Sequence, residues 1–163
     1  MRVLAVLLAL FSSSAHAGVA AYEACVGDGY EARVMAKFME RFPSETCEAM
    51  AQCPPVLMQS AEALTRAECR ADALDDCESE KCRLGLTERW RADGAALRAG
   101  IEARLERVDL TVLPPLKARR LGDPERWLTE VDCTGDAAIC EAVTAGQALG
   151  DLERLSREVE ALP

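Results

Sequence analysis

The stretch from Ser79 to Asp109 constrains the fold of this chain more than any other part of the sequence. From Trp90 onward its apolar residues recur at steps of three and four, which is the period of one face of an α-helix. The stripe is made of Leu84, Trp90, Gly94, Leu97, Ile101, Leu105 and Val108. A helix of this length is roughly 45 Å long and gains stability by packing its stripe against other helices. We therefore predict one long central helix over about residues 79–109.

The composition favours helices in the rest of the chain as well. The chain has only two Trp, two Tyr and three Phe residues, and it has few of the β-branched runs that strands favour. Ala, Leu, Glu and Arg, which favour helices, predominate. We therefore expect an all-α, disulfide-stapled bundle of five or six helices around the long central helix.

The N-terminus has the organisation of a secretory signal peptide. A short positive region precedes the apolar run Val3–Phe11, and Ala15-His16-Ala17 matches the small-x-small cleavage pattern. The apolar run is too short to cross a bilayer, which takes about 20 residues. A buried N-terminal helix is the alternative interpretation. We expect residues 1–17 to be removed near Ala17 on export to the periplasm or the medium. Residues 18–163 would then form a single disulfide-rich helical domain without a membrane span.

All eight cysteines lie in the predicted mature chain: Cys25, Cys47, Cys53, Cys69, Cys77, Cys82, Cys133 and Cys140. An even number of cysteines in a small exported domain is typical of a disulfide framework, here of four bridges. The sequence leaves the pairing open, although a local bridge between Cys133 and Cys140 is plausible. Zinc binding and thioredoxin-type redox chemistry are the alternatives, and the absence of any C-x-x-C spacing disfavours both.

Caps and prolines divide the chain before the central helix. We expect an irregular leader over Gly18–Gly29 and a first helix that Asp28 caps and Pro43 ends. A second helix is expected over Glu45–Cys53 and a third over about Val56–Asp75, with a possible break at Thr65.

After the central helix, one helical turn is expected before Gly122, and Asp123-Pro124 signals the start of another helix. We expect Trp127, Leu128 and Val131 of that helix to face the core. Asp136 is expected to cap the last helix, whose apolar residues are Ile139, Val143, Leu149, Leu152, Leu155, Val159 and Leu162.

The charges are acidic overall and unevenly distributed. The predicted mature chain has 18 basic and 28 acidic side chains. Residues 83–121 are mildly basic, whereas the segments on both sides are acidic. Rows of charged side chains along a helix are commonly its solvated face, but an acidic surface can also attract a cationic partner. Nucleic acid is disfavoured, because binding to phosphates needs a basic surface.

The sequence indicates no catalytic, cofactor-binding or metal-binding site. The only histidine, His16, belongs to the predicted signal peptide, which excludes His-dependent nucleophiles and His-ligated metals from the mature chain. Gly146–Gly150 lies in a helical pattern and lacks the features of a phosphate loop. Among 28 acidic residues, a pair at glycosidase distance arises by chance. We therefore expect a protein that is not an enzyme and uses no cofactor.

One segment of about 30 residues resembles a known family. Trp127-Leu128, Cys133, Cys140, Thr144 and the Leu-rich last helix resemble the second half of a family of exported lysozyme inhibitors, although the loop between the two cysteines is shorter here. The resemblance implies an acidic helical protein that binds a basic hydrolase.

Three functions follow as hypotheses. The first is an exported, non-enzymatic binding or structural module with an acidic surface, whose partner is an unidentified protein, with a cationic one favoured. The second is a periplasmic inhibitor of a cationic hydrolase such as lysozyme. The third is a carrier of a small apolar ligand, with Phe38, Phe42, Trp90 and Trp127 as the lining.

Overall fold

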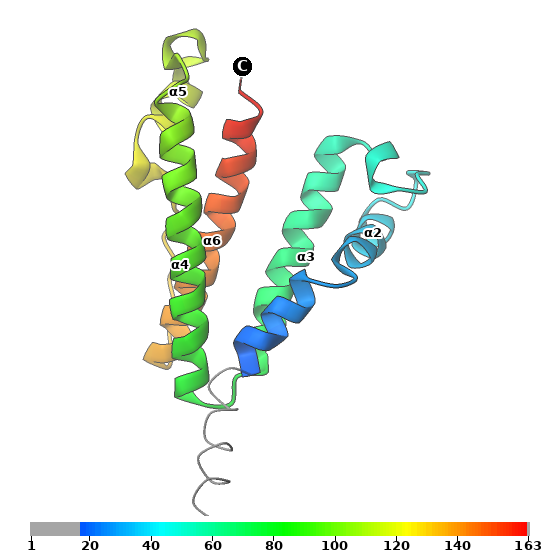
Figure 1. The fold of residues 1–163 in the computed structure, drawn as a ribbon, viewed down its shortest axis with the longest axis vertical. Helices are drawn as coiled ribbons and strands as arrows, with labels where there is room; N and C mark the ends of the chain where they lie inside the picture. The colour runs from blue at the N-terminus through cyan, green and yellow to red at the C-terminus, as the bar shows by residue number, and fades with distance from the viewer. Residues whose placement is uncertain (1–16, 163) are drawn as a thin grey trace, which may run out of the picture. The chain divides into compact units, whose positions relative to one another are not determined.

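The computed structural model describes residues 17–162 (Figure 1). These residues form six α-helices and three short 3-10 helices, and no strand occurs among them, so the all-α prediction is confirmed. The chain divides into two compact units, Met1–Leu86 and Thr87–Pro163. The single-domain prediction for residues 18–163 stays a prediction. The predicted signal peptide lies outside the described residues, except for Ala17.

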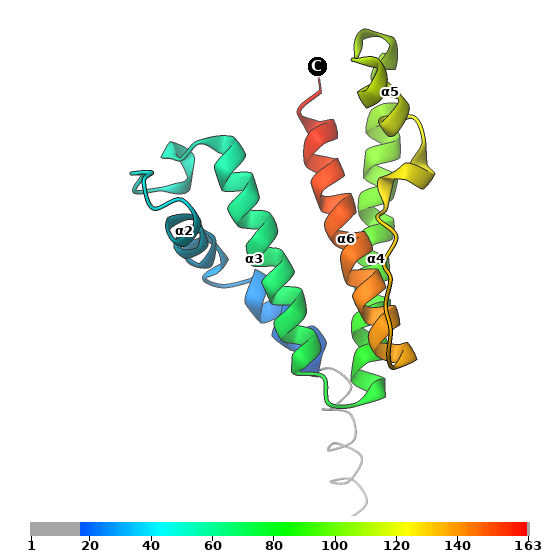
Figure 2. The same ribbon diagram turned by 180° about the vertical axis from the view of Figure 1, so that it is seen from behind.

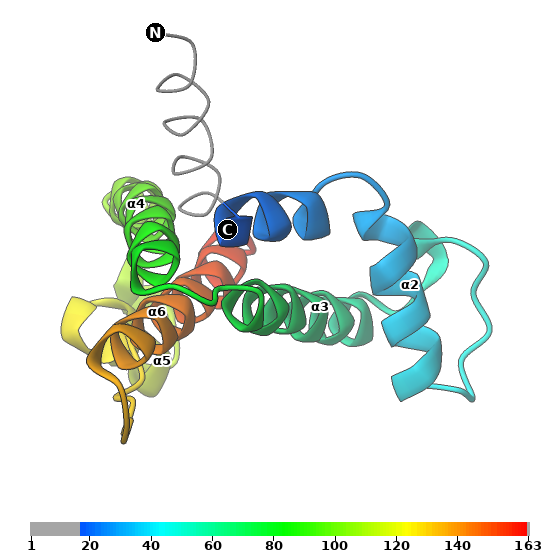
Figure 3. The ribbon, with the colours of Figure 1, turned by 90° about the horizontal axis from the view of Figure 1, so that it is seen from below.

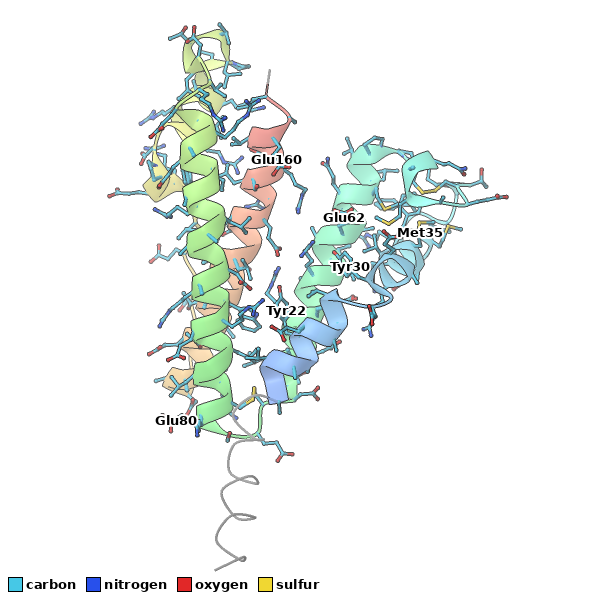
Figure 4. All side chains as sticks on the ribbon, in the orientation of Figure 1. Tyr22, Tyr30, Met35, Glu62, Glu80 and Glu160 are labelled. Atoms are coloured by element: carbon cyan, nitrogen blue, oxygen red, sulfur yellow. A yellow bond between two sulfur atoms is a disulfide. The ribbon has the colours of Figure 1, made fainter. Side chains whose placement is uncertain are left out.

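The first unit contains a helix over residues 17–26, followed by α2 (Tyr30–Arg41), the 3-10 helix η1 (Met50–Gln52) and α3 (Pro55–Asp75). Figure 3 shows residues 17–26 running alongside α3. The hydroxyl of Tyr30 at the start of α2 donates to the carbonyl of Glu62 in α3 at 3.4 Å (Figure 4). The core between α2 and α3 contains Val34, Phe38, Cys53, Met58 and Ala61.

The start of the first unit differs from the prediction. Residues 17–26 are helical, not an irregular leader, because Gly18, Tyr22 and Cys25 are buried at helical spacing. A Cβ at Gly18 would overlap the sulfur of Cys77, so the sequence places a glycine where two segments approach closely. The predicted cap at Asp28 is also wrong. Gly29 is the N-cap of α2, with a φ of 79°, and no side chain caps this helix.

Two further predictions for the first unit are wrong. The predicted helix over Glu45–Cys53 is absent apart from η1. The Cys47–Cys53 disulfide holds their Cα atoms 5.3 Å apart, whereas six residues of α-helix span about 9 Å. The possible break at Thr65 does not occur: α3 is continuous, and the buried Thr65 hydroxyl donates to the Ala61 carbonyl of the preceding turn at 2.9 Å instead of capping a new helix.

The long central helix is confirmed as α4 (Glu80–Leu105), and its start and end differ from the predicted bounds. The Ser79 hydroxyl accepts a hydrogen bond from the Cys82 N–H at 3.2 Å and caps the helix as predicted. The helix ends four residues earlier than Asp109, in a turn at residues 106–107. Leu84 of the predicted stripe is 41% exposed, whereas Leu86 is fully buried.

The second unit pairs α4 with α6 (Ala137–Glu160), and three short elements connect them. These elements are η2 (Leu110–Val112), α5 (Pro115–Leu121) and η3 (Pro124–Trp127). The core of this unit is made of Ile101, Leu121, Trp127, Leu152, Leu155, Val159 and Leu162.

Asp136 caps α6 as predicted, because its carboxylate accepts hydrogen bonds from the N–H groups of Ala138 and Ile139 at 3.0 and 3.1 Å. The helix predicted after Asp123 is only the 3-10 turn η3. Trp127 is buried as predicted, but Leu128 is exposed and Val131 only half-buried. Ile139 and Val143 of the predicted last-helix stripe are also partly exposed.

All eight cysteines form disulfides. Cys25–Cys69 joins segments 44 residues apart, whereas the other three bridges close short loops. The local bridges are Cys47–Cys53, Cys77–Cys82 and Cys133–Cys140. Four disulfides indicate that the chain matures in an oxidising compartment outside the cytoplasm. Among the described residues, we find no helix with the length and apolar character needed to cross a membrane.

Candidate functional site: an anchored acidic loop

The most distinctive irregular segment of the second unit is residues 128–136, which we call the acidic loop. Figure 2 shows it as an extended stretch between η3 and the start of α6. Leu128, Thr129, Glu130 and Asp132 are exposed, and from Glu130 onward exposed positions alternate with the half-buried Val131 and Cys133. Because side chains alternate along an extended backbone, Leu128, Glu130 and Asp132 project from the same side of the loop.

The first anchor of the acidic loop is Trp127, which directly precedes it. The indole is buried in the core of the second unit, and its Nε1–H donates to the Leu121 carbonyl at 3.3 Å. The Arg98 guanidinium lies 5.4 Å from the centre of the ring, in a cation–π contact. These contacts hold the N-terminal end of the loop at a defined place on the unit.

The second anchor is Asp151, a buried carboxylate on α6. One of its oxygens accepts from the Thr129 N–H at 2.7 Å. The other accepts from Gln147 at 3.2 Å and from the Arg154 guanidinium at 2.8 Å. A buried carboxylate is tolerated only where hydrogen bonds and a counter-charge replace water, and here they do so while fixing the loop backbone.

The third anchor is the Cys133–Cys140 disulfide, which ties the loop to the first turn of α6. Asp136 adds its cap to the same turn. Gly135 between them has a φ of 143°, a conformation that other residues rarely adopt. The C-terminal end of the loop is therefore fixed covalently, by a helix cap and by a glycine turn.

Most backbone N–H groups of the acidic loop make no hydrogen bond within the described part of the chain. Within the described part of the chain, Thr129 is the one residue of 128–135 whose N–H donates a hydrogen bond to another protein group. The remaining amide groups of this extended stretch are open to water or to a binding partner. A loop held in one conformation loses little conformational entropy when a partner binds.

The carboxylates in and near the loop differ in whether they make contacts within the protein. Asp136 caps α6, and just before the loop Asp123 pairs with Arg126 at 2.7 Å. Glu130 and Asp132 are exposed and form no ion pair with other described residues. They are therefore the two charges of the loop that a cationic partner can reach without first breaking an internal contact.

The first unit has a cavity of about 250 Å³ between α2 and α3, and its one lysine is paired with two of the acids that line it. The Lys37 ammonium lies 2.7 Å from Glu40 and 2.8 Å from Glu68. The hydrogen bonds that Lys37 donates to these two carboxylates raise its pKa above its usual value. The pair with Glu40 likewise lowers the pKa of that carboxyl.

A second cavity, of about 340 Å³, lies between α4 and α6, with Leu97, Gly100, Ile101 and Val159 among its lining residues. The aromatic residues considered for a carrier line neither cavity. Phe38 and Phe42 pack against each other in the core of the first unit, with their ring centres 5.4 Å apart. Trp127 belongs to the core of the second unit, and Trp90 is buried.

Among residues 17–162, no group of three or more His, Cys, Asp or Glu side chains is close enough to hold a metal ion. The sequence pointed to Trp127, Cys133, Asp136 and Cys140 individually, but it did not assemble them into one loop. Asp151 was missed. The sequence feature that could have indicated its burial is its position directly before Leu152, on the apolar face of the last helix.

Comparisons of the chain with protein-family models, with curated proteins and with solved structures find no match.

Proposed function

We propose that this chain is an exported, non-enzymatic binding protein that uses the acidic loop to bind a cationic protein. The observation that carries the proposal is the pair of exposed carboxylates, Glu130 and Asp132, on a loop held by a buried tryptophan, a buried carboxylate and a disulfide. Fixed loops that display charge bind partners with a small entropy cost and select them by electrostatic complementarity.

The charge of the chain supports a cationic partner. Acidic side chains outnumber basic ones by 28 to 19 over the full sequence. A field of this sign accelerates encounter with a basic protein and slows encounter with nucleic acid. Maturation in an oxidising compartment, together with the signal-peptide pattern of residues 1–17, supports export to the periplasm or the medium.

Lys37 and Asp109, two groups with shifted pKa values, lack the properties of a general acid or base. Hydrogen bonds raise the pKa of Lys37, and bonds from Thr111 lower the pKa of Asp109, so both groups are held in their charged forms. A general acid or base at neutral pH needs the opposite, a pKa moved toward 7. The proposal is refuted if a purified sample shows turnover that a single carboxylate substitution abolishes.

A more specific candidate is an inhibitor of a cationic hydrolase such as a lysozyme. The resemblance of Trp127-Leu128, Cys133, Cys140 and Thr144 to exported lysozyme inhibitors includes two of the three anchors of the acidic loop, the tryptophan and the disulfide, although the segment between the two cysteines is shorter here. A fixed extended loop is also well suited to fill the cleft of an enzyme.

The test is binding of the disulfide-intact protein to a basic lysozyme and to a cationic protein without hydrolase activity. The variant Glu130→Gln/Asp132→Asn removes two loop charges. Glu88→Gln/Glu102→Gln removes two exposed charges of α4 and serves as the matched control. We expect the loop variant to lower the association rate about tenfold at low salt and the control to change it little.

Each outcome separates the hypotheses. Binding to both cationic proteins that depends on the loop charges supports the general proposal, and loss of lysozyme activity on binding supports the inhibitor. Equal effects of the loop and control variants would show that binding depends on overall charge, and they would contradict the assignment to the acidic loop.

A further inference from the structure

A second exposed feature lies at the C-terminal end of α4, where residues 106–120 form what we call the basic tip (Figure 1). The tip contains the turn after α4, η2, the Pro114-Pro115 pair and most of α5. The acidic loop begins only after η3, so the two features are separate in the sequence.

The basic tip displays two aliphatic side chains on an ordered backbone. Leu116 is 85% exposed and Val112 is 68% exposed. Their neighbours Leu110 and Leu113 pack against the core of the second unit and hold the segment in place. Asp109 accepts hydrogen bonds from the Thr111 N–H at 2.9 Å and from its hydroxyl at 2.6 Å, which fixes η2.

Among the described residues, two cations of the tip and one of its two acids, Glu106, are exposed and make no ion pair or side-chain hydrogen bond. Lys117 and Arg119 are exposed, and neither makes an ion pair or hydrogen bond with another side chain of the described residues. Arg120 pairs with Glu158 at 3.3 Å, and Arg107 donates to the Ala103 carbonyl at 3.1 Å. The tip holds four basic and two acidic side chains in a chain whose net charge is −9.

We propose that the basic tip adsorbs reversibly to an anionic phospholipid surface. Exposed aliphatic side chains beside cations suit the membrane interface, where the apolar groups reach the acyl boundary and the cations meet phosphates. A soluble phosphate would leave Val112 and Leu116 in water. Two aliphatic side chains are also much less than the roughly 800 Å² per partner of a standard protein interface.

The segment that follows the basic tip in the sequence carries the opposite charge. An anionic surface repels the acidic residues 122–163, which hold ten acids and three bases, and attracts the tip. Two aliphatic groups and two unpaired cations supply only weak attraction, so the contact is reversible and sensitive to salt.

The test is co-sedimentation of the exported, disulfide-intact protein with vesicles. Mass spectrometry first verifies that the apolar run Val3–Phe11 has been removed, because that run would bind vesicles by itself. Vesicles of phosphatidylglycerol and phosphatidylcholine are compared with pure phosphatidylcholine, and glycerol phosphate is added as a soluble competitor. Binding to soluble polyglutamate is measured as well, because this polymer represents an acidic protein partner instead of a membrane.

Two variant pairs separate the tip from general charge and hydrophobicity. Lys117→Gln/Arg119→Gln is expected to weaken binding to anionic vesicles about thirtyfold, since each cation near the surface contributes about fivefold and the two factors multiply. Its control, Lys81→Gln, removes an exposed lysine of the first unit. Leu116→Ser is expected to weaken binding about tenfold. Its control is Val56→Ser, at a residue that is 76% exposed in the first unit.

Binding to anionic vesicles that both tip variants weaken, and that both controls retain, supports the proposal. It is overturned by absence of binding to anionic vesicles or by equal binding to pure phosphatidylcholine. Equal losses in the control variants would overturn it too. Binding of polyglutamate in place of vesicles, with the same dependence on Lys117 and Arg119, would assign the tip to an acidic protein instead. Full competition by glycerol phosphate at millimolar concentration would assign it to a soluble phosphate.

Discussion

The Cys25–Cys69 disulfide is expected to contribute most to the stability of the first unit. It joins the helix over residues 17–26 to α3 across 44 residues of chain, whereas Cys47–Cys53 in the same unit spans 6. A bridge stabilises the folded state mainly by restricting the unfolded chain, and the restriction increases with loop length. Cys25→Ala/Cys69→Ala should therefore destabilise the unit more than Cys47→Ala/Cys53→Ala.

The magnitude follows from the two loop lengths. Chain entropy assigns about 4 kcal/mol to a closed loop of 44 residues and about 2 kcal/mol to a loop of 6. The difference, about 1.8 kcal/mol, depends only on the ratio of the lengths. Both variants replace sulfur with a methyl group at sites that are buried or half-buried, so the packing losses largely cancel in the comparison.

The assay should report on the first unit directly, because both disulfides under comparison lie in it. Amide hydrogen exchange of α3, followed across a urea series, provides its free energy of opening. Wild type, Cys25→Ala/Cys69→Ala and Cys47→Ala/Cys53→Ala are compared under the same conditions. An equal loss in the two variants, or a larger loss in the local one, would refute the loop-length argument.

Three other perturbations test the second unit. Asp151→Ala should cost about 3 kcal/mol in urea unfolding, because it removes three hydrogen bonds to a buried carboxylate and leaves the Thr129 N–H without a partner; unchanged hydrogen exchange at Thr129 would contradict its role as an anchor. Trp127→Ala should cost about 3–5 kcal/mol in thermal or urea unfolding, as expected for a buried indole, and a loss below 1 kcal/mol would place the indole outside the core. Bonds from Thr111 lower the pKa of Asp109 in the folded chain, so its contribution to stability is present above the unfolded pKa and is lost as pH falls through the folded one. An NMR titration of the Asp109 carboxyl should show this lowered pKa, and Thr111→Val should return it toward the ordinary value.

The parts of the fold that the sequence predicted well depend on strong local signals. Ser79 and Asp136 are capping residues in front of long amphipathic stretches, and both cap their helices in the structure. Long helices are predictable because many residues repeat the same period, so one misplaced position such as Leu84 changes little.

The parts that were missed depend on contacts between distant residues. Glu45–Cys53 has helical propensity, but its local disulfide draws the two ends too close together for a helix. In residues 17–26, Gly18, Tyr22 and Cys25 form a buried stripe. The sequence does not reveal this stripe, because the glycine is explained only by its close approach to Cys77 in the folded chain. The acidic loop was missed for the same reason, because Asp151 lies in another helix, and only the folded chain brings its carboxylate to Thr129.

The nesting of the disulfides has a consequence for biosynthesis. Three native bridges join cysteines that are neighbours in the sequence, but Cys25–Cys69 encloses Cys47–Cys53. An oxidase that joins thiols in the order in which they emerge would link Cys25 to Cys47 and Cys53 to Cys69. The same oxidase would form Cys77–Cys82 and Cys133–Cys140 correctly. With such an oxidase, maturation of the first unit would require thiol–disulfide exchange to correct the early pairs, whereas the bridge of the second unit would need oxidation alone.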